Sequence, residues 1–195
     1  MSEVAGAGTL EEVRRLAQSC TACPLAAART QVVFARGDPE ASLMLVGEGP
    51  GREEDLQGEP FVGRSGKLLD RLVAEEMGLG RDECYVCNTV KCRPPGNRDP
   101  LPGELQACRP FLDAQLAFVR PQVVVTLGNF ASRALLHVTE GVTRLRGRTY
   151  PFGDAVLVPT FHPSAALRGG GEVVAQMRAD LVRAKRHLSS GGGRR

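Results

Sequence analysis

The sequence predicts an α/β fold in which helices cover both faces of a parallel sheet. Short apolar runs of strand length alternate along the chain with segments of helical periodicity. The connections between them are short, and such alternation is typical of parallel strands joined by crossover helices. The 195 residues, 42% of them apolar, fit one domain with a substantial core. We expect this domain to cover residues 1–188 and the glycine-rich end, residues 189–195, to be a disordered tail.

The first predicted helix and strand lead to a glycine-rich loop. Thr9 and Glu12 have the spacing of a capping box, so a helix should begin there and run to about Ser19. Residues 43–46 are all apolar and predict a buried strand, which stops at the loop GEGPG, residues 47–51. Functional loops often follow strands of such a sheet directly.

A helix, a strand and an irregular loop come next. Ser65 can cap a helix with apolar residues at helical spacing, and the glycines within residues 78–80 should end it. Residues 85–90 predict the second strand. Residues 92–100 are too rich in proline and glycine for a helix or a strand, so they should form a loop.

The second half of the chain continues the alternation. The pattern predicts a helix at 103–119, a strand at 123–127, a helix at 129–136, a strand at 156–158 and a last helix at 172–188. Ligands of parallel sheets bind at the carboxyl ends of the strands. The loops at 47–51, at Asn88 and at His162 all follow strands, and we expect them to meet at that edge.

Charge and hydropathy limit the possible partners. The net charge of +3 is a weak indication of a polyanionic partner. Basic residues gather at Arg144, Arg146 and Arg148 and again between residues 168 and 195; such clusters either bind phosphate or are solvated faces. No apolar run approaches the roughly 20 residues of a membrane span, and the N-terminus lacks the order of a secretion signal. We therefore expect a cytoplasmic protein that does not act at a membrane.

Two nucleotide-binding motifs are incomplete. The dinucleotide fingerprint that begins at Gly47 would need a glycine where Arg52 stands. After Gly66-Lys67, a phosphate-binding loop would need a hydroxyl residue where Leu68 stands. Both classes of site are excluded.

Cysteine spacing indicates a metal centre, because a reducing compartment disfavours disulfides. Strand geometry would point Cys84 and Cys87 to opposite faces, so they cannot hold one centre. The remaining four form the coherent set: Cys20, Cys23, Cys92 and Cys108. Their spacing suits zinc or a [4Fe-4S] cluster equally well. The alternative is that the cysteines are buried apolar residues.

An aromatic residue and a histidine are candidates for a binding site. Phe61 lies between turn residues close to the end of the first strand, where its ring could stack on a base, although packing is the commoner role. His162 is the one histidine in a strand-to-loop setting, whereas His137 and His187 fall on helical stretches. A structural role for His162 is the alternative.

Four motifs together resemble those of the family 4 uracil-DNA glycosylases. They are GEGPG at 47–51, PFVG at 60–63, NTVKCRPP at 88–95 and HPS at 162–164, and the likeness extends from Cys20 to about Arg186. The resemblance implies a three-layer α/β/α fold with a central four-stranded parallel sheet. It also implies a [4Fe-4S] cluster rather than zinc on the four selected cysteines, and an enzyme that removes uracil from DNA during base-excision repair.

The same resemblance implies roles for individual residues. Phe61 would stack on uracil, Asn88 would bond its O4 and N3-H, and Glu54 would lie against C5 and crowd the methyl group of thymine. His162 and backbone N-H groups of the Glu48-Gly49 turn would stabilise negative charge on O2, and Gly47 would also belong to the uracil-binding set. The catalytic set is therefore His162, Asn88 and Glu48, with Glu48 as a candidate for orienting the attacking water.

Contacts with DNA are implied after His162. Residues 164–168 match the position of the family's DNA-penetrating loop, with Leu167 as the wedge and Arg168 near phosphate. This sequence has Gly49 where many members have alanine, and the run of glycines at 169–171 should make the loop's end flexible. The expected partner is uracil-containing DNA, single- or double-stranded, bound by a monomer.

Two other functions compete with this one. A crosslinking branch of the superfamily stays on DNA through a histidine in an Arg-rich insertion, but residues 93–102 contain neither the histidine nor the insertion. A non-catalytic iron-sulfur protein that binds nucleic acid is the second alternative. An excision assay on uracil-containing DNA separates both from a glycosylase.

Overall fold

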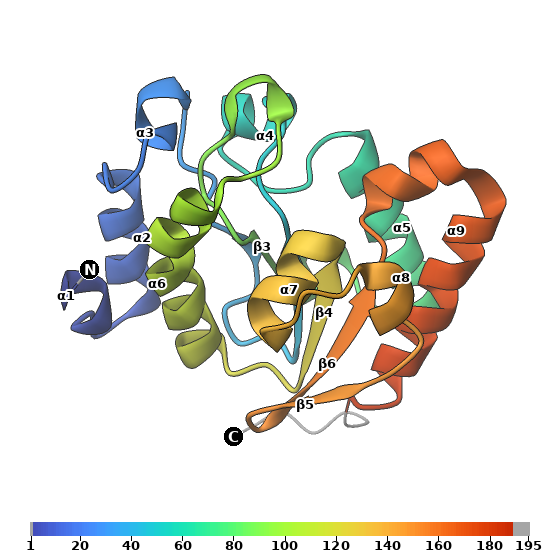
Figure 1. The fold of residues 1–195 in the computed structure, drawn as a ribbon. Coiled ribbons are helices and arrows are strands. Elements are labelled where there is room, and N and C mark those ends of the chain that lie inside the picture. Colours follow the sequence, from blue (N-terminus) through green and yellow to red (C-terminus); the bar gives the residue numbers. More distant parts are fainter. Residues whose placement is uncertain (1, 189–195) are drawn as a thin grey trace.

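The computed structural model describes residues 2–188 of the chain (Figure 1). The helices are α1 (Ser2–Ala5), α2 (Leu10–Gln18), α3 (Leu25–Ala28), α4 (Arg52–Gln57), α5 (Arg64–Met77), α6 (Pro102–Val119), α7 (Asn129–Leu136), α8 (Val142–Leu145) and α9 (Pro163–Lys185), with the 3-10 turns η1 (Arg81–Glu83) and η2 (Pro95–Asn97). The strands are β1 (Arg36–Gly37), β2 (Leu43–Gly47), β3 (Tyr85–Asn88), β4 (Val123–Leu127), β5 (Tyr150–Phe152) and β6 (Ala155–Thr160).

The strands form one mixed sheet in the order β1-β3-β2-β4-β6-β5. Its four central strands are parallel, and they are the four that the sequence predicts. The edge strands β1 and β5 pair antiparallel with β3 and β6. Sequence analysis misses both edge strands because runs of two and three residues carry no readable periodicity. The predicted second strand also ends earlier, at Asn88 rather than Val90.

Helices cover both faces of the sheet, which confirms the three-layer arrangement (Figure 1). Alternate residues of β2 enter different cores: Leu43 and Leu45 pack with α5 and α9, whereas Met44 and Val46 pack with α2, α6 and α7. Every residue of β2, β3 and β4 is buried. Such continuous apolar strands are expected where a parallel sheet is covered on both sides.

Two helix starts test the capping predictions. At α2, the side chain of Thr9 accepts a hydrogen bond from the backbone N-H of Glu12, so the predicted cap is confirmed. At α5, the prediction is wrong: the N-cap is Gly63, and Ser65 lies inside the first turn. Gly78 ends α5 in the left-handed conformation at φ 75°, as its sequence predicts.

Helix α9 begins much earlier than expected. Residues 164–168, expected as a loop, are helical, because Pro163 occupies the first turn and the ring of His162 caps the helix by accepting from the N-H of Ser164. The backbone is non-helical at Gly170, where φ is 69°, so α9 consists of two helical pieces joined at a kink. The glycine run therefore turns the chain between two helical pieces.

Within residues 2–188, no helix is both long and apolar enough to cross a membrane. The tail expected at residues 189–195 lies outside the described part of the chain.

Candidate active site

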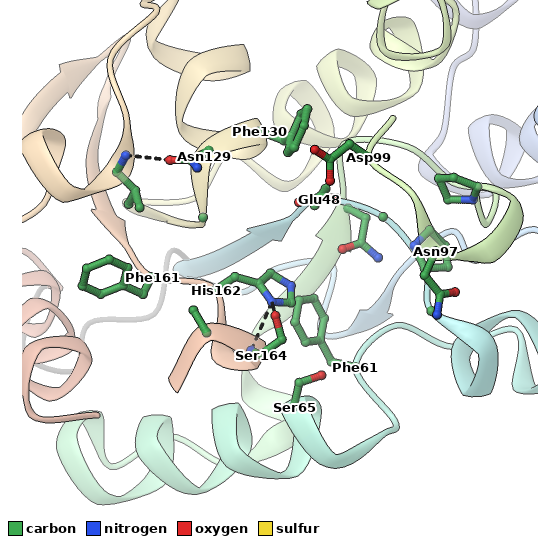
Figure 2. Close-up of a pocket in the computed structure, with 18 of the residues that line it drawn as sticks. Glu48, Phe61, Ser65, Asn97, Asp99, Asn129, Phe130, Phe161, His162 and Ser164 are labelled. Carbon is green, nitrogen blue, oxygen red and sulfur yellow. Dashed lines mark hydrogen bonds between the residues drawn. The ribbon is translucent and has the colours of Figure 1, made fainter. Parts of the chain in front are cut away.

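A cavity of about 610 Å³ opens at the carboxyl edge of the sheet. It lies where β2, β3 and β6 end and where α7 begins, as the strand-end argument predicts. Figure 2 shows the lining side chains pointing into this space from several segments. Of the residues singled out in the sequence, these line it: Glu48, Gly49, Glu54, Phe61, Asn88, His162 and Arg168.

The loop after β2 is tied to the segment after β3. The N-H of Thr89 donates to the carbonyl of Gly47 at 2.9 Å, and the N-H of Val90 donates to the carbonyl of Glu48 at 3.1 Å. A Cβ added to Gly47 would lie 2.4 Å from Oδ1 of Asn88, and one on Gly49 would lie 2.7 Å from Cγ2 of Val90. Gly47 does not line the cavity itself, but it allows the pocket side chains to approach one another closely.

Asn88 presents an unpaired acceptor to the cavity. Its side chain is 1% exposed, and its Oδ1 is the one buried side-chain oxygen or nitrogen within residues 2–188 that has no hydrogen-bond partner. A buried polar atom without a partner costs about 1–3 kcal/mol, so an atom of this kind at a cavity wall calls for a partner inside the cavity. The atom therefore points to a ligand that carries an N-H or O-H donor.

Phe61 lies beside Asn88 and His162 in a constrained conformation. It is 4% exposed, and its φ of 57° is rare for a residue with a side chain. A Cβ on Gly66 would lie 1.7 Å from the carbonyl oxygen of Phe61, so only glycine permits this approach of α5. The ring centroid lies 5.7 Å from that of His162 with a tilt of 33° (Figure 2). These contacts fix an aromatic wall of the cavity.

His162 is a neutral hydrogen-bond donor. Burial, together with the charge of Arg168, lowers its pKa to about 4, so the ring is uncharged at neutral pH. The N-H of Ser164 donates to Nδ1 at 3.2 Å, and the Ser164 hydroxyl lies 2.8 Å from the same nitrogen. Because Nδ1 must accept from that N-H, the single ring proton is on Nε2.

Glu48 is a carboxyl group whose charge is suppressed. Burial and the negative charge of Asp99 raise its pKa to about 7. Asp99 comes from the loop before α6, and its neighbour Arg98 is paired with the buried Glu104, with N-O distances of 2.9 and 2.6 Å. Two carboxyl groups from separate loops therefore face the same part of the cavity (Figure 2).

Glu54 lines the cavity from the first turn of α4. Its Oε1 accepts from the N-H of Gly63 at 3.4 Å, so the carboxylate also connects α4 to the loop that carries Phe61.

The residues expected to touch DNA lie on the first piece of α9. Leu167 is 45% exposed, and Arg168 lines the cavity. Arg146, from the basic cluster considered for phosphate binding, instead pairs with the fully buried Asp180 at 2.9 Å. Since Asp180 also accepts from Thr160 at the end of β6, Arg146 supports the strand that delivers His162.

The four selected cysteines line one small cavity: Cys20, Cys23, Cys92 and Cys108. This cavity lies between α2, α3, α6 and the segment after β3. Arg29 donates to Sγ of Cys92 at 3.3 Å, and the N-H of Lys91 donates to Sγ of Cys108 at 3.3 Å. Burial raises the pKa of the Cys108 thiol to about 11. No three His, Cys, Asp or Glu side chains within residues 2–188 lie close enough to hold a single metal ion.

Cys84 and Cys87 lie apart from that cavity. Cys84 packs in the core beneath α5, and Cys87 packs in the core on the opposite face of the sheet. The alternation of side chains along β3 therefore separates them, as the sequence predicts.

Sequence analysis misses some of the residues that line the cavity. Asn129 follows the end of β4, so the strand-end rule could have identified it; its Oδ1 accepts from the N-H of Val142 at 2.7 Å and fixes α8. Asp99 lies in a proline-rich loop whose path has no periodic signal. Phe130 and Phe161 also line the cavity.

Fold and site together define a class of protein. A pocket at the carboxyl edge of a parallel sheet, with an aromatic wall, an unpaired amide oxygen and a neutral imidazole, fits a protein that reads the edge of one planar heterocycle. Residues 34–185 match the family model of the uracil DNA glycosylase superfamily.

Individual relatives give a finer classification. A type-4 uracil-DNA glycosylase of Thermotoga maritima is 42% identical over 94% of this chain and 96% of its own. One from Sulfurisphaera tokodaii is 41% identical over 82% of this chain and 76% of its own, and one from Archaeoglobus fulgidus is 40% identical over 82% and 83%. The chain belongs to the uracil DNA glycosylase superfamily and, within it, to the type-4 uracil-DNA glycosylases.

Proposed function

We propose that this chain flips uracil out of DNA into the cavity and hydrolyses its N-glycosidic bond, leaving an abasic site for base-excision repair. The observation that carries the proposal is the buried, unpaired Oδ1 of Asn88. Uracil N3-H would donate to this oxygen, and the Asn88 amide N-H would donate to O4. Cytosine presents an acceptor and a donor in the reverse order, so it would leave two buried polar pairs mismatched.

Stacking and exclusion add to this selection. Phe61 lines the cavity, and its ring would stack on an extruded base. Glu54, whose carboxylate accepts from the loop that carries Phe61, would crowd a methyl group on C5 and so exclude thymine. Extrusion costs a few kcal/mol, which contacts in the pocket must offset.

The chemical step requires stabilisation of negative charge on uracil O2. Ser164 fixes the half-buried ring of His162, so the Nε2-H donor needs no reorganisation when charge develops. Backbone N-H groups of Glu48 and Gly49 would add to it. Because the pKa of His162 is about 4, the ring acts as a hydrogen-bond donor and not as an acid that transfers its proton.

Water must then attack the sugar. Glu48 is a suitable group for orienting that water, since its pKa of about 7 leaves it partly ionised at neutral pH and able to accept a proton from water. Burial is the larger cause of this raised pKa, and the negative charge of Asp99 adds to it.

DNA would approach the mouth of the cavity over the first piece of α9. Leu167 is an exposed apolar side chain that would enter the space left by the flipped base, and Arg168 would contact phosphate. A wedge on a helix is held more rigidly than one on a loop, which reduces the entropy lost on binding.

A [4Fe-4S] cluster fits the cysteine site. Four thiols converge there, and N-H donors from Arg29 and Lys91 already reach two of the sulfurs, an arrangement that stabilises thiolates. A four-iron cluster holds its ligands further apart than a single ion does. When bound, the cluster would supply iron-thiolate bonds that tie α2 to α6 and to the segment after Asn88, so its role would be structural.

Cysteine variants test the cluster directly. Purified protein should be brown, and Cys→Ala changes at the four ligand positions should each remove the colour and the bound iron. Cys84→Ala and Cys87→Ala should keep both. A requirement for either of the latter two would contradict the assignment.

An oligonucleotide with one uracil tests the activity. Incubation followed by alkaline cleavage should cut the strand at the uracil, whereas matched strands with cytosine or thymine should remain intact. A protein-DNA adduct that survives denaturation would instead support the crosslinking alternative. Binding without strand cleavage would support the non-catalytic one.

A further inference from the structure

Lys91 has an unusual position between the two sites. Its side chain is 2% exposed, and Nζ donates to the main-chain carbonyl of Asn88 at 2.6 Å and to Oε1 of Gln115 at 2.5 Å. Gln115 is fully buried, and its amide nitrogen donates to the carbonyl of Phe34 at 3.0 Å and the hydroxyl of Tyr85 at 3.1 Å. This network fixes the ammonium group inside the protein.

The charge of Lys91 has no acidic partner among residues 2–188, because no carboxylate lies within 4.0 Å of its nitrogen. Its two oxygen acceptors are neutral carbonyl groups, and its further side-chain partner is Cys87, a buried thiol whose raised pKa keeps it uncharged. Burying an ammonium group is costly unless an anion lies nearby. These hydrogen bonds satisfy its protons but do not balance its charge.

Lys91 lines the same small cavity as the four selected cysteines, so a cluster bound there would bring negative charge close to it. Lys91 precedes Cys92 in the chain, and its backbone N-H donates to Sγ of Cys108 at 3.3 Å. Four thiolates give a [4Fe-4S] cluster a net negative charge, and that charge would balance a buried cation at this place. On its other side, the same cation holds the backbone of the residue whose amide faces the pocket.

We propose that Lys91 is a positioning residue that couples the two sites: its buried ammonium group is the counter-charge of the cluster site and fixes the backbone of Asn88 so that the amide faces uracil. The proposal rests on the proposed function. In this proposal the cluster site influences base recognition through the Lys91 side chain. This route adds to the main-chain connection between Asn88 and Cys92.

Three substitutions test the coupling in the cluster-loaded protein. Lys91→Met removes the charge and the hydrogen bonds, Lys91→Gln removes the charge but keeps a shorter polar side chain, and Lys91→Arg keeps the charge. Lys185→Met is the matched control, because Lys185 is an exposed lysine at the end of α9. Iron content and circular dichroism establish that each variant is folded and loaded; if Lys91→Met does not fold, Lys91→Gln carries the test.

The midpoint potential of the cluster is the first readout. Loss of a nearby positive charge disfavours the more negative reduced cluster, so Lys91→Met and Lys91→Gln should both shift the potential downwards. Lys91→Arg and Lys185→Met should stay close to the wild type. Equal potentials in all the variants would overturn the proposal, since a lysine that only fills space would not change this property.

Excision is the second readout. Loss of a hydrogen bond from a charged group should lower the single-turnover rate of Lys91→Met on uracil DNA by roughly 10- to 100-fold, with little change in DNA affinity. An unchanged rate, or a loss confined to affinity, would overturn the link to Asn88. If the wild type itself releases no uracil, the proposed function fails, while the potentials still report the charge of Lys91.

Discussion

Replacing His162 tests the catalytic mechanism most directly. The neutral ring is fixed at Nδ1 by Ser164, packs near Phe61, and leaves Nε2-H as its donor. His162→Ala removes that donor and leaves the Asn88 amide and the glycine turn in place. Gly128 borders this histidine, since a Cβ added there would lie 3.1 Å from the Cβ of His162, but the alanine variant keeps that Cβ atom and its packing.

The expected loss follows from the donor's role. Removal of one preorganised oxyanion donor costs roughly 2.7–4 kcal/mol, which corresponds to a rate that is about 100- to 1,000-fold lower. Single-turnover excision from a single-stranded uracil oligonucleotide measures this step without interference from product release or base extrusion. Binding of DNA should change little. Ser164→Ala is the control for orientation: it removes the hydroxyl contact at 2.8 Å and keeps the backbone N-H, so its loss should be much smaller.

A full rate for His162→Ala would refute the oxyanion assignment. The pH dependence provides an independent check, because a pKa of about 4 keeps the ring neutral throughout the range above about pH 5. The wild-type rate should therefore show no decline that is due to His162 between about pH 5 and pH 8. A rate that increases towards acid pH would instead show that a charged imidazole transfers its proton.

Other residues yield further predictions. Asn88→Asp exchanges the donor to O4 for a carboxylate oxygen, so single-turnover excision should fall by orders of magnitude while thermal unfolding stays close to the wild type; an unchanged rate would remove Asn88 from the pocket. Leu167→Ala should slow excision from paired uracil much more than from single strands, because only the duplex requires stacking to be broken; equal losses would make Leu167 a packing residue. If ionised Glu48 orients the water, the rate should increase with pH through about 7, and Asp99→Asn should shift this rise somewhat to lower pH, because burial still raises the Glu48 pKa but the added charge of Asp99 is gone. An unshifted pH profile in Asp99→Asn would show that Asp99 does not influence the Glu48 pKa.

Much of the fold follows from local sequence patterns. The runs that form β2, β3, β4 and β6 are largely apolar because both faces of a parallel sheet are covered, and such runs are visible without coordinates. The edge strands β1 and β5 are visible only in the structure, since each exists through pairing with a longer neighbour. The start of α9 is also not predicted by the sequence pattern. The glycine run predicts a flexible loop, whereas the structure has a helix before Gly170 and another after it.

The sequence by itself determines which chemical groups are present and at which strand ends they lie: the glycine turn after β2, Asn88 at the end of β3, and His162 after β6. Parallel strands bring these ends to one edge, so the site's location needs no tertiary information. Tertiary structure alone decides how those groups behave. Burial beside Asp99 raises the pKa of Glu48, and burial near Arg168 keeps His162 neutral. The tertiary structure also leaves Oδ1 of Asn88 without a partner and encloses the charge of Lys91. These properties depend on distances between residues far apart in the chain, which no local pattern records, and on the exclusion of water, which only the packed protein achieves.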